Sequence, residues 1–355
     1  MPRSARVIAI VAAAALAGAC NSDNPKLPAL GADLQATSVS GLSAGAYMAG
    51  QFQIAHSNIV KGAGIVAGGP YGCAESAFAD VMPGPGAPFL NLSKAMNGCM
   101  LDAMQAWGIP NVRNLADRAN RLAQAGRIDA PAALSRGRVY LFTGSKDHVV
   151  VPSIVKAAAE LYAALGVPPA QIKLVSDVPA GHAFVTVDKG LACGKTGEPY
   201  VTDCDYDQAR DLLGHIYGTL QPRSSEPSGE FIVFDQQEFT RDLAGHGLDQ
   251  AGVAYIPRSC RTARGCRVHI AFHGCNQQRA KAGDAFIKDS GFANWADANR
   301  IVVLFPQVSP STINPQACWD WWGYTGRDYL TRTGPQIVAV RRMLDRLVAQ
   351  STARR

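Results

Sequence analysis

Short apolar segments of strand type alternate with segments of helical length along most of this chain, and this alternation limits the folds open to it. Strands are predicted over residues 34–40, 62–67, 138–143, 172–175, 231–235, 254–257, 267–272 and 301–305, and helices over 44–57, 92–107, 112–125, 153–165, 207–219, 285–299 and 335–349. Residues 82–89 and 189–205 are predicted loops. This spacing is typical of a mostly parallel sheet with helices on both faces. The sequence therefore predicts an α/β fold whose site lies beyond the carboxyl ends of the strands.

Composition narrows the class of protein. Of the 355 residues, 47% are hydrophobic and 17% are charged, so the chain can bury a large core. The net charge is +6, from 34 basic and 28 acidic residues, and Arg3 and Arg6 belong to a leader segment. No long basic run occurs, so nucleic acid is not expected as a partner.

The first residues have the pattern of an export signal. Two arginines precede an apolar run over residues 7–17, which is too short to anchor in a bilayer, and small residues then lead to Cys20. We predict a signal peptide over residues 1–19. Leu-Ala-Gly-Ala-Cys20 resembles a bacterial lipoprotein signal, and both a lipid anchor on Cys20 and plain cleavage stay open. Either outcome implies an exported protein, in the periplasm, on the outer membrane or outside the cell.

The remaining chain is divided by composition. Residues 20–33 are predicted to be a flexible spacer, and residues 34–350 a single catalytic domain. A stretch rich in Pro, Ser and Glu over residues 222–229 is a candidate internal linker.

Eight cysteines remain when Cys20 is set aside, an even number that suits an oxidising compartment. Short loops favour disulfides between Cys193 and Cys204 and between Cys260 and Cys266. The simplest remainder pairs Cys73 with Cys99 and Cys275 with Cys318. The alternative is that some of them are free buried thiols. A zinc site is not expected, because no C-x-x-C pair occurs.

The sequence Gly41-Leu42-Ser43-Ala44-Gly45 stands between a predicted strand and a predicted helix. That is the context of a nucleophile elbow, a tight turn that needs small residues on both sides of a serine and exposes its hydroxyl. Ser43 is therefore the candidate nucleophile. The alternative is an ordinary glycine-rich turn.

A serine nucleophile needs a base and a carboxylate that orients the base. Asp147 follows the strand at 138–143 and is the candidate acid; alternatively it caps the next helix. His182 follows the strand at 172–175 and is the candidate base, with His148 as its nearest rival. The order Ser43, Asp147, His182 is that of α/β hydrolases.

One expected part is displaced in the sequence. α/β hydrolases commonly have a His-Gly segment after an early strand, which donates an oxyanion-hole N–H. Too few residues precede Ser43 to form that strand, and His273-Gly274-Cys275 follows the strand at 267–272 instead. We interpret this as a circular permutation and expect the N–H groups of Ala44 and Cys275 to form the oxyanion hole. The alternative is that His273 and Gly274 only end a strand.

The stretch Cys318-Trp319-Asp320-Trp321-Trp322-Gly323-Tyr324 contains three of the five tryptophans. Its aromatic residues form either a packing cluster of the core or a rigid apolar platform for a substrate chain. We predict Trp319, Trp321, Trp322, Tyr324 and His273 as substrate-binding residues.

Five segments together resemble secreted poly(3-hydroxybutyrate) depolymerases, in particular a circularly permuted group with a C-terminal oxyanion segment. They are Gly-Leu-Ser43-Ala-Gly-Ala-Tyr-Met-Ala, Gly-Ser-Lys-Asp147-His-Val-Val, Gly-His182-Ala-Phe, Phe-His-Gly-Cys275-Asn-Gln and Cys-Trp-Asp-Trp-Trp-Gly-Tyr. The resemblance covers about residues 35–348. It implies an α/β-hydrolase fold and serine-esterase attack on polyester links, with Ser43 as nucleophile, His182 as base and Asp147 as its partner. It also implies a preference for amorphous polymer or soluble oligomers, because many relatives carry a separate polymer-binding domain and this sequence does not.

Two alternatives to this function remain. A feruloyl or acetyl esterase on polysaccharide would use the same fold and triad, and the tryptophan-rich stretch suits either substrate. A non-catalytic envelope-binding protein would not need Ser43, Asp147, His182 and the His273-Gly-Cys segment together. No metal or organic cofactor is expected for acyl transfer by such a triad.

Overall fold

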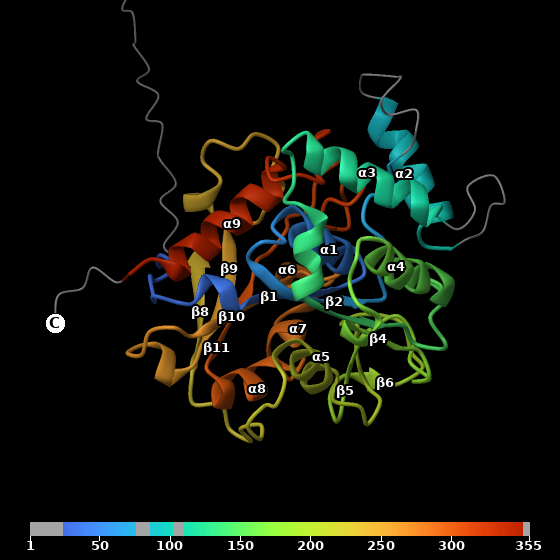
Figure 1. Ribbon diagram of the computed structural model, residues 1–355. Coiled ribbons are helices and arrows are strands. Elements are labelled where there is room, and N and C mark those ends of the chain that lie inside the picture. Colours follow the sequence, from blue (N-terminus) through green and yellow to red (C-terminus); the bar gives the residue numbers. More distant parts are fainter. Residues whose placement is uncertain (1–23, 76–85, 102–109, 351–355) are drawn as a thin grey trace, which may run out of the picture.

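A single eight-stranded sheet runs through the computed structural model, which describes residues 24–75, 86–101 and 110–350 (Figure 1). The strands are β1 (Thr37–Leu42), β2 (Val60–Val66), β3 (Arg138–Phe142), β4 (Ile172–Val175), β8 (Glu230–Asp235), β9 (Ala251–Ile256), β10 (Arg267–Phe272) and β11 (Ile301–Phe305). Their order across the sheet is β4-β3-β2-β1-β10-β11-β9-β8. The six strands from β4 to β11 are parallel, and β9 and β8 are antiparallel to their neighbours.

The strand order explains the displaced oxyanion segment. When the strands are counted from β8, the order becomes 1-2-4-3-5-6-7-8, which is the order of the α/β-hydrolase fold. The third strand of that count is β10 and the fifth is β1, and these two pair directly from Thr37 with Val268 to Gly41 with Phe272. The chain termini have therefore moved relative to an unpermuted hydrolase, but the two loops that carry the candidate site remain neighbours. The predicted α/β class is confirmed.

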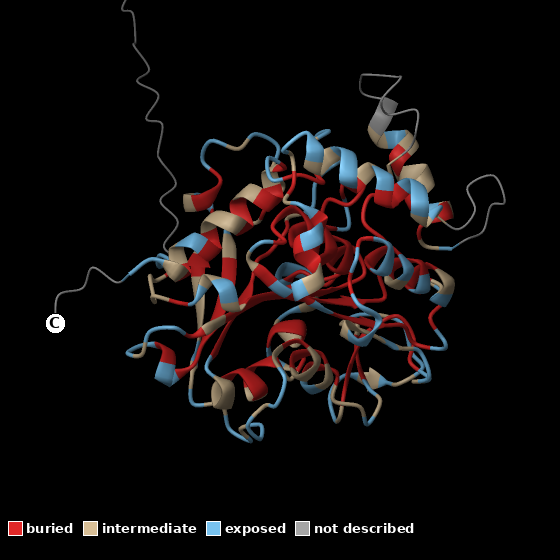
Figure 2. Ribbon diagram, viewed as in Figure 1, coloured by how far each residue is buried: buried red, intermediate tan, exposed pale blue. Residues whose placement is uncertain are grey.

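Helices cover both faces of the sheet and bury two apolar cores (Figures 1 and 2). One core contains residues of α1 (Ala44–Ala55), α3 (Val112–Gln124), α4 (Pro152–Ala164) and α9 (Pro335–Val348). The other contains residues of α5 (Gln208–Tyr217), α7 (Ala285–Lys288) and α8 (Phe292–Asn299). Side chains alternate along β3, where Leu141 faces the first core and Phe142 the second. This is the alternation of a sheet covered on both faces.

Every residue of α1 is buried, because other parts of the chain surround this helix (Figure 2). Its sequence, AGAYMAGQFQIA, is correspondingly small and apolar rather than amphipathic. The remaining helices are α2 (Gly86–Gly98) and α6 (Arg279–Ala282).

The predicted loop at 189–205 contains a small sheet of its own. Strands β6 (Leu191–Ala192) and β7 (Val201–Asp203) join β5 (Phe184–Thr186), and a Cys193–Cys204 disulfide closes the segment. We call residues 189–204 the stapled segment. It follows His182 in the chain.

Some predicted boundaries are wrong. Residues Leu34–Ala36 form a short 3-10 helix, and the strand begins only at Thr37. The helix predicted over 285–299 is broken into α7 and α8, because Gly291 takes φ +82, which ends a regular helix. Residues 86–89, predicted as loop, begin α2, and the helix predicted over 92–107 ends at Gly98; residues 76–85 and 102–109 lie outside the described residues.

The spacer prediction is also corrected for residues 24–33. Leu27 is buried in the core, and the N–H groups of Leu30 and Ala32 donate to the Leu347 carbonyl at the end of α9. The candidate linker at 222–229 leads from α5 to β8, and its Ser228 bonds the Asp297 carboxylate on α8. The predicted signal peptide and Cys20 lie outside the described residues. Among the helices described, none is long and apolar enough to cross a bilayer.

Candidate active site

The turn at Ser43 has the geometry of a nucleophile elbow. Ser43 takes φ 58 and ψ −121, a backbone conformation that costs energy in any residue with a side chain. Its N–H donates to the Val66 carbonyl at 2.9 Å, and its own carbonyl accepts the Ala46 and Tyr47 N–H groups of the first turn of α1. The strained residue is thus held by β2 on one side and by α1 on the other.

The two glycines of the motif are required by close backbone contacts. A Cβ on Gly41 would lie 2.2 Å from the Gly45 carbonyl carbon, inside the turn itself. A Cβ on Gly45 would lie 2.3 Å from the Phe272 carbonyl oxygen and 2.5 Å from that of His273. The second glycine therefore allows the serine turn to lie directly against the end of β10. The second glycine of this local sequence motif is therefore required by a tertiary contact between the nucleophile turn and the loop after β10.

Asp147 and His182 are joined by a hydrogen bond of 2.8 Å between Asp147 Oδ2 and His182 Nδ1. Asp147 Oδ1 accepts the N–H groups of Val149 and Val150, so one carboxylate oxygen orders its own loop and the other faces the histidine. Both side chains are buried. The rival His148 is exposed, and Asp147 does not bond it within the described structure.

The three candidate residues follow strands whose carboxyl ends are aligned. Leu42, Val66, Phe142 and Val175 are in register across β1 to β4. Ser43 follows β1, Asp147 lies in the loop after β3, and His182 lies in the loop after β4. Ser43 remains 9% exposed. Its Oγ makes no hydrogen bond within the described residues, so the pairing of Ser43 with His182 stays a prediction.

The loop after β10, residues 273–277, is called the oxyanion loop here. Three of its N–H groups are bonded within the protein: Gly274 donates to Gln277 Oε1, Asn276 to the Gln316 carbonyl and Gln277 to the Gly274 carbonyl. In the described part of the chain, the N–H of Cys275 and that of Ala44 have no acceptor. These two groups are the predicted oxyanion donors, and their role stays a prediction.

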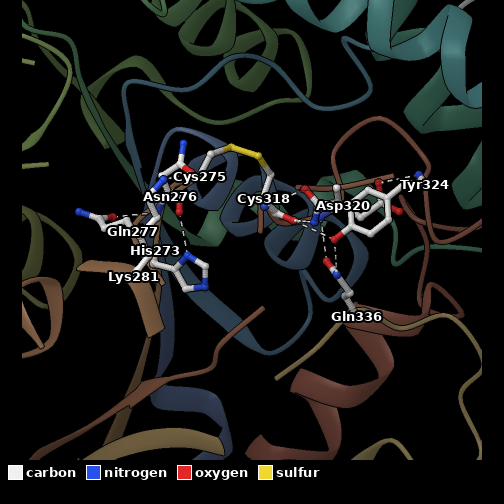
Figure 3. The surroundings of a disulfide bond; sticks show 11 residues. His273, Cys275, Asn276, Gln277, Lys281, Cys318, Asp320, Tyr324 and Gln336 are labelled. Atoms are coloured by element: carbon white, nitrogen blue, oxygen red, sulfur yellow. Dashed lines mark hydrogen bonds between the residues drawn. A yellow bond between two sulfur atoms is a disulfide. The ribbon is translucent and has the colours of Figure 1, made fainter. Parts of the chain in front are cut away.

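A disulfide between Cys275 and Cys318 ties the oxyanion loop to the tryptophan-rich stretch (Figure 3). The other disulfides join Cys73 with Cys99, Cys193 with Cys204 and Cys260 with Cys266. The four pairings favoured by the sequence are therefore confirmed. They indicate a chain that folds in an oxidising compartment.

His273 was predicted to contact substrate, and the structure corrects this. Its ring is 1% exposed, its Nδ1 lies 2.8 Å from the Gly274 carbonyl and its Nε2 accepts the Val308 N–H at 3.2 Å. Burial lowers the pKa of His273 to about 4, so the ring is neutral and carries its proton on Nδ1. Both nitrogens are used inside the protein. His273 supports the oxyanion loop and has no donor left for a ligand.

The tryptophans are also more buried than a substrate platform would be. Trp319 is 0% exposed and packs edge-on against Phe272. Trp321 is 6% exposed and stacks on Tyr47 of α1 with ring centroids 4.2 Å apart, and Trp322 packs against Trp321 at right angles. The packing alternative therefore holds for Trp319. Trp321 and Trp322 keep only a narrow edge for any ligand.

Tyr324 and Asp320 shape this stretch rather than present it to solvent. The Tyr324 hydroxyl donates to the Cys318 carbonyl and accepts from Gln336 Nε2 (Figure 3). The Asp320 carboxylate accepts the N–H groups of Gly323, Tyr324 and Thr325. Burial raises the pKa of Asp320, and these bonds oppose that effect. Sequence reasoning missed Asp320, although an aspartate three residues before a glycine is a turn signal.

A cavity of about 1250 Å³ opens elsewhere, beside α5, and none of the candidate catalytic residues lines it. Among the charged groups that line it, Lys173 pairs with Asp211 and Arg223 with Asp207. Within the described residues, no cluster of three His, Cys, Asp or Glu side chains could hold a metal ion.

Comparison with known proteins gives the same assignment as the site. No family model matches the chain. A poly(3-hydroxybutyrate) depolymerase of Delftia acidovorans is 39% identical over 326 residues, which are 90% of this chain and 61% of that protein. The chain thus spans about three fifths of the length of that relative. A polyhydroxybutyrate depolymerase of Talaromyces funiculosus is 32% identical over 342 residues, 91% of this chain and 92% of that protein.

Two solved structures share the fold with a TM-score of 0.79 and 31% identity, and they cover 92% of this chain and 100% of their own. One is the crystal structure of a PHB depolymerase from Penicillium funiculosum, and the other is a PHB depolymerase with a serine replaced by alanine, complexed with an R3HB trimer. These relatives do not favour the carbohydrate-esterase alternative. The elbow at Ser43, the Asp147–His182 pair, the permuted sheet and these similarities lead to one conclusion: the chain belongs to the poly(3-hydroxybutyrate) depolymerase family.

Proposed function

We propose that this protein is a serine esterase that hydrolyses poly(3-hydroxybutyrate) or its oligomers to 3-hydroxybutyrate monomer and dimer. The observation that carries the proposal is the buried Asp147–His182 hydrogen bond, which lies at the carboxyl ends of the strands, where the strained Ser43 turn also lies. Packing of a hydrophobic core requires neither a strained serine turn nor a buried pair of carboxylate and imidazole, so both features indicate a functional site.

We infer the proton positions from this hydrogen bond. Asp147 accepts the Nδ1–H of His182, which leaves the Nε2 lone pair as the base. In the proposed first step, His182 Nε2 takes the Ser43 hydroxyl proton while Oγ forms a bond to the ester carbonyl carbon. The carbonyl π electrons move to oxygen and give a tetrahedral oxyanion. When the carbon–oxygen ester bond breaks, the alcohol end leaves with the proton from His182.

The free N–H groups of Ala44 and Cys275 are the proposed donors to that oxyanion. They belong to the first turn of α1 and to the oxyanion loop, which lie in contact through Gly45. Water then attacks the acyl-enzyme with the same base, and the acid is released. Losing one such donor typically slows acyl transfer about 100- to 1,000-fold.

The substrate class rests on the relatives. Their names are those of poly(3-hydroxybutyrate) depolymerases, and one neighbour was solved with an R3HB trimer. Trp321 and Trp322 supply the apolar edges against which the methyl groups of such a chain would lie. We further propose that residues 1–19 are a signal peptide, that the enzyme acts in the periplasm, on the outer membrane or outside the cell, and that Cys20 is a candidate lipid anchor.

The test is product release from amorphous poly(3-hydroxybutyrate) and from soluble 3-hydroxybutyrate oligomers by wild type, Ser43→Ala and Ser135→Ala. Ser135 lies just before β3, at the opposite edge of the sheet, and serves as the matched control. Wild type and Ser135→Ala should release monomer or dimer, and Ser43→Ala should not. An active Ser43→Ala enzyme would contradict the nucleophile. A wild type that cleaves p-nitrophenyl esters but neither polyester would contradict the substrate.

A further inference from the structure

The side chain of Gln277 is 2% exposed and makes three hydrogen bonds, all to backbone groups. Its Oε1 accepts the Gly274 N–H at 2.8 Å. Its Nε2 donates to the carbonyls of Pro199 and Tyr200, at 3.2 and 3.1 Å. Figure 3 shows Gln277 beside Cys275 and Asn276. A buried side-chain amide that forms hydrogen bonds with backbone groups of two different segments links those segments.

The first bond acts on the oxyanion loop itself. Rotation of the peptide units on either side of Gly274 would turn the N–H groups of Gly274 and Cys275 into the site or away from it. By accepting the Gly274 N–H, Gln277 holds that group within the loop and leaves the next N–H, of Cys275, as the free one. The Asn276 bond to Gln316 fixes the loop from its other side.

The second pair of bonds reaches the histidine. The Tyr200 carbonyl that accepts from Gln277 also accepts the Phe184 N–H at 2.9 Å, two residues after His182. The same stapled segment holds His182 directly, because Thr196 Oγ1 accepts the His182 N–H at 2.8 Å, and the Cys193 carbonyl accepts that of Gly181. Gln277 thus connects the proposed oxyanion donor with the segment that places the proposed base.

We propose that Gln277 is a positioning residue for the reaction: it orients the oxyanion loop so that the Cys275 N–H is free, and it ties this loop to the stapled segment behind His182. The inference rests on the proposed esterase function. Gln277 touches no reacting atom in this scheme, so its loss should alter the rate of the chemical step rather than the binding of substrate.

The test compares Gln277→Leu with Gln278→Leu on a soluble p-nitrophenyl butyrate ester. Gln278 is a matched control, since it is the next residue, is 4% exposed and has an Oε1 without a hydrogen-bond partner among the described residues. We expect kcat of Gln277→Leu to fall about 10- to 100-fold, somewhat less than for complete loss of a donor, with KM unchanged. Gln278→Leu should keep the wild-type kcat.

Hydrogen exchange supplies a readout that does not depend on activity. In Gln277→Leu, amides of residues 273–278 and 196–200 should exchange faster than in wild type, whereas Gln278→Leu should leave the 196–200 amides unchanged. If Gln277→Leu does not fold, Gln277→Glu replaces it: the carboxylate still accepts from Gly274 but cannot donate to Pro199 and Tyr200. A reduced kcat in Gln277→Glu supports the tie to the stapled segment.

A folded Gln277→Leu or Gln277→Glu variant with wild-type kcat overturns the proposal. So does an equal loss in Gln277→Leu and Gln278→Leu, which would indicate general loop packing. An inactive wild type would instead contradict the esterase function, and the exchange comparison would still test the tie between the two segments.

Discussion

Gly45 offers the sharpest test of how close packing builds this site. It lies in α1 with ordinary helical backbone, so alanine there costs nothing in conformation. The added Cβ, however, would lie 2.3 Å from the Phe272 carbonyl oxygen, where ordinary contact begins at 3.4 Å. The serine turn and the end of β10 must therefore separate by about 1 Å. A displacement of about 1 Å between reacting groups can cost about 100-fold in rate.

We expect Gly45→Ala to lose about 100-fold in kcat on p-nitrophenyl butyrate, while overpacking costs about 1–3 kcal/mol of stability. Gly50→Ala is the control on the same helix. Its Cβ would meet the Tyr162 hydroxyl at 3.6 Å and Ile65 Cδ1 at 3.7 Å, both ordinary contacts. That variant should keep the wild-type kcat, and its free energy of unfolding should rise by about 0.5–1 kcal/mol, because glycine is unfavourable inside a helix. A folded Gly45→Ala enzyme with wild-type kcat would refute the reasoning.

Three further predictions follow from contacts in and around the site. Asp147→Asn should lower kcat about 10,000-fold at unchanged KM, because His182 loses the partner that fixes its tautomer. A loss below tenfold in steady-state kinetics would show that Asp147 is not the carboxylate of the triad. Replacing Cys275 and Cys318 by serine should lower the free energy of unfolding by about 4 kcal/mol and reduce kcat. The same change at Cys260 and Cys266, before β10, should lower it by about 2 kcal/mol and leave kcat unchanged. Equal kcat values in the two double variants would contradict a role for the first disulfide in holding the oxyanion loop. Burial lowers the pKa of His269 to about 3 and that of His273 to about 4. In the unfolded chain the pKa of a histidine is near ~6.5, so the unfolded state takes up protons first as the pH falls. Each buried histidine should therefore lower the free energy of unfolding by roughly 1 kcal/mol by pH ~5.5. Urea unfolding between pH ~7 and ~5 should show a shallower loss for His269→Gln than for wild type, and parallel curves would disprove the assignment.

The elements that the sequence predicted well are those with a strong local cause. The strand at 138–143 appears as β3 with its ends shifted by one residue at most, because a continuous run of Val, Tyr, Leu and Phe suits a strand that is buried on both faces. The break at Gly291 was missed. The apolar pattern continues across it, and only the packing of α7 and α8 against β11 and α5 requires two short helices there.

The two short disulfides were predictable because loop length favours short connections, and the two long ones are the simplest remainder among the cysteines left. The burial of the aromatic stretch was not predictable. Trp319, Trp321 and Trp322 have the same composition whether they form a platform or a core, and only their contacts with Phe272 and Tyr47 decide between the two. His273 is a similar case, since its role depends on the Val308 N–H that reaches its ring from a distant segment.

Local sequence was sufficient for the class of fold, for the displaced oxyanion segment that indicates a permutation, and for the candidates Ser43, Asp147 and His182. Turn sterics and strand–helix alternation depend on neighbouring residues, so a sequence shows them directly. The tertiary structure decided which groups around that site are free. The expectation for the Cys275 N–H came from comparison with the known hydrolase fold, because backbone N–H groups are the same in every residue and no local property distinguishes this one from that of Gly274. Acceptors on Gln277 and Gln316 bind the N–H groups of Gly274 and Asn276, and that of Cys275 has no acceptor among the residues that the structure describes.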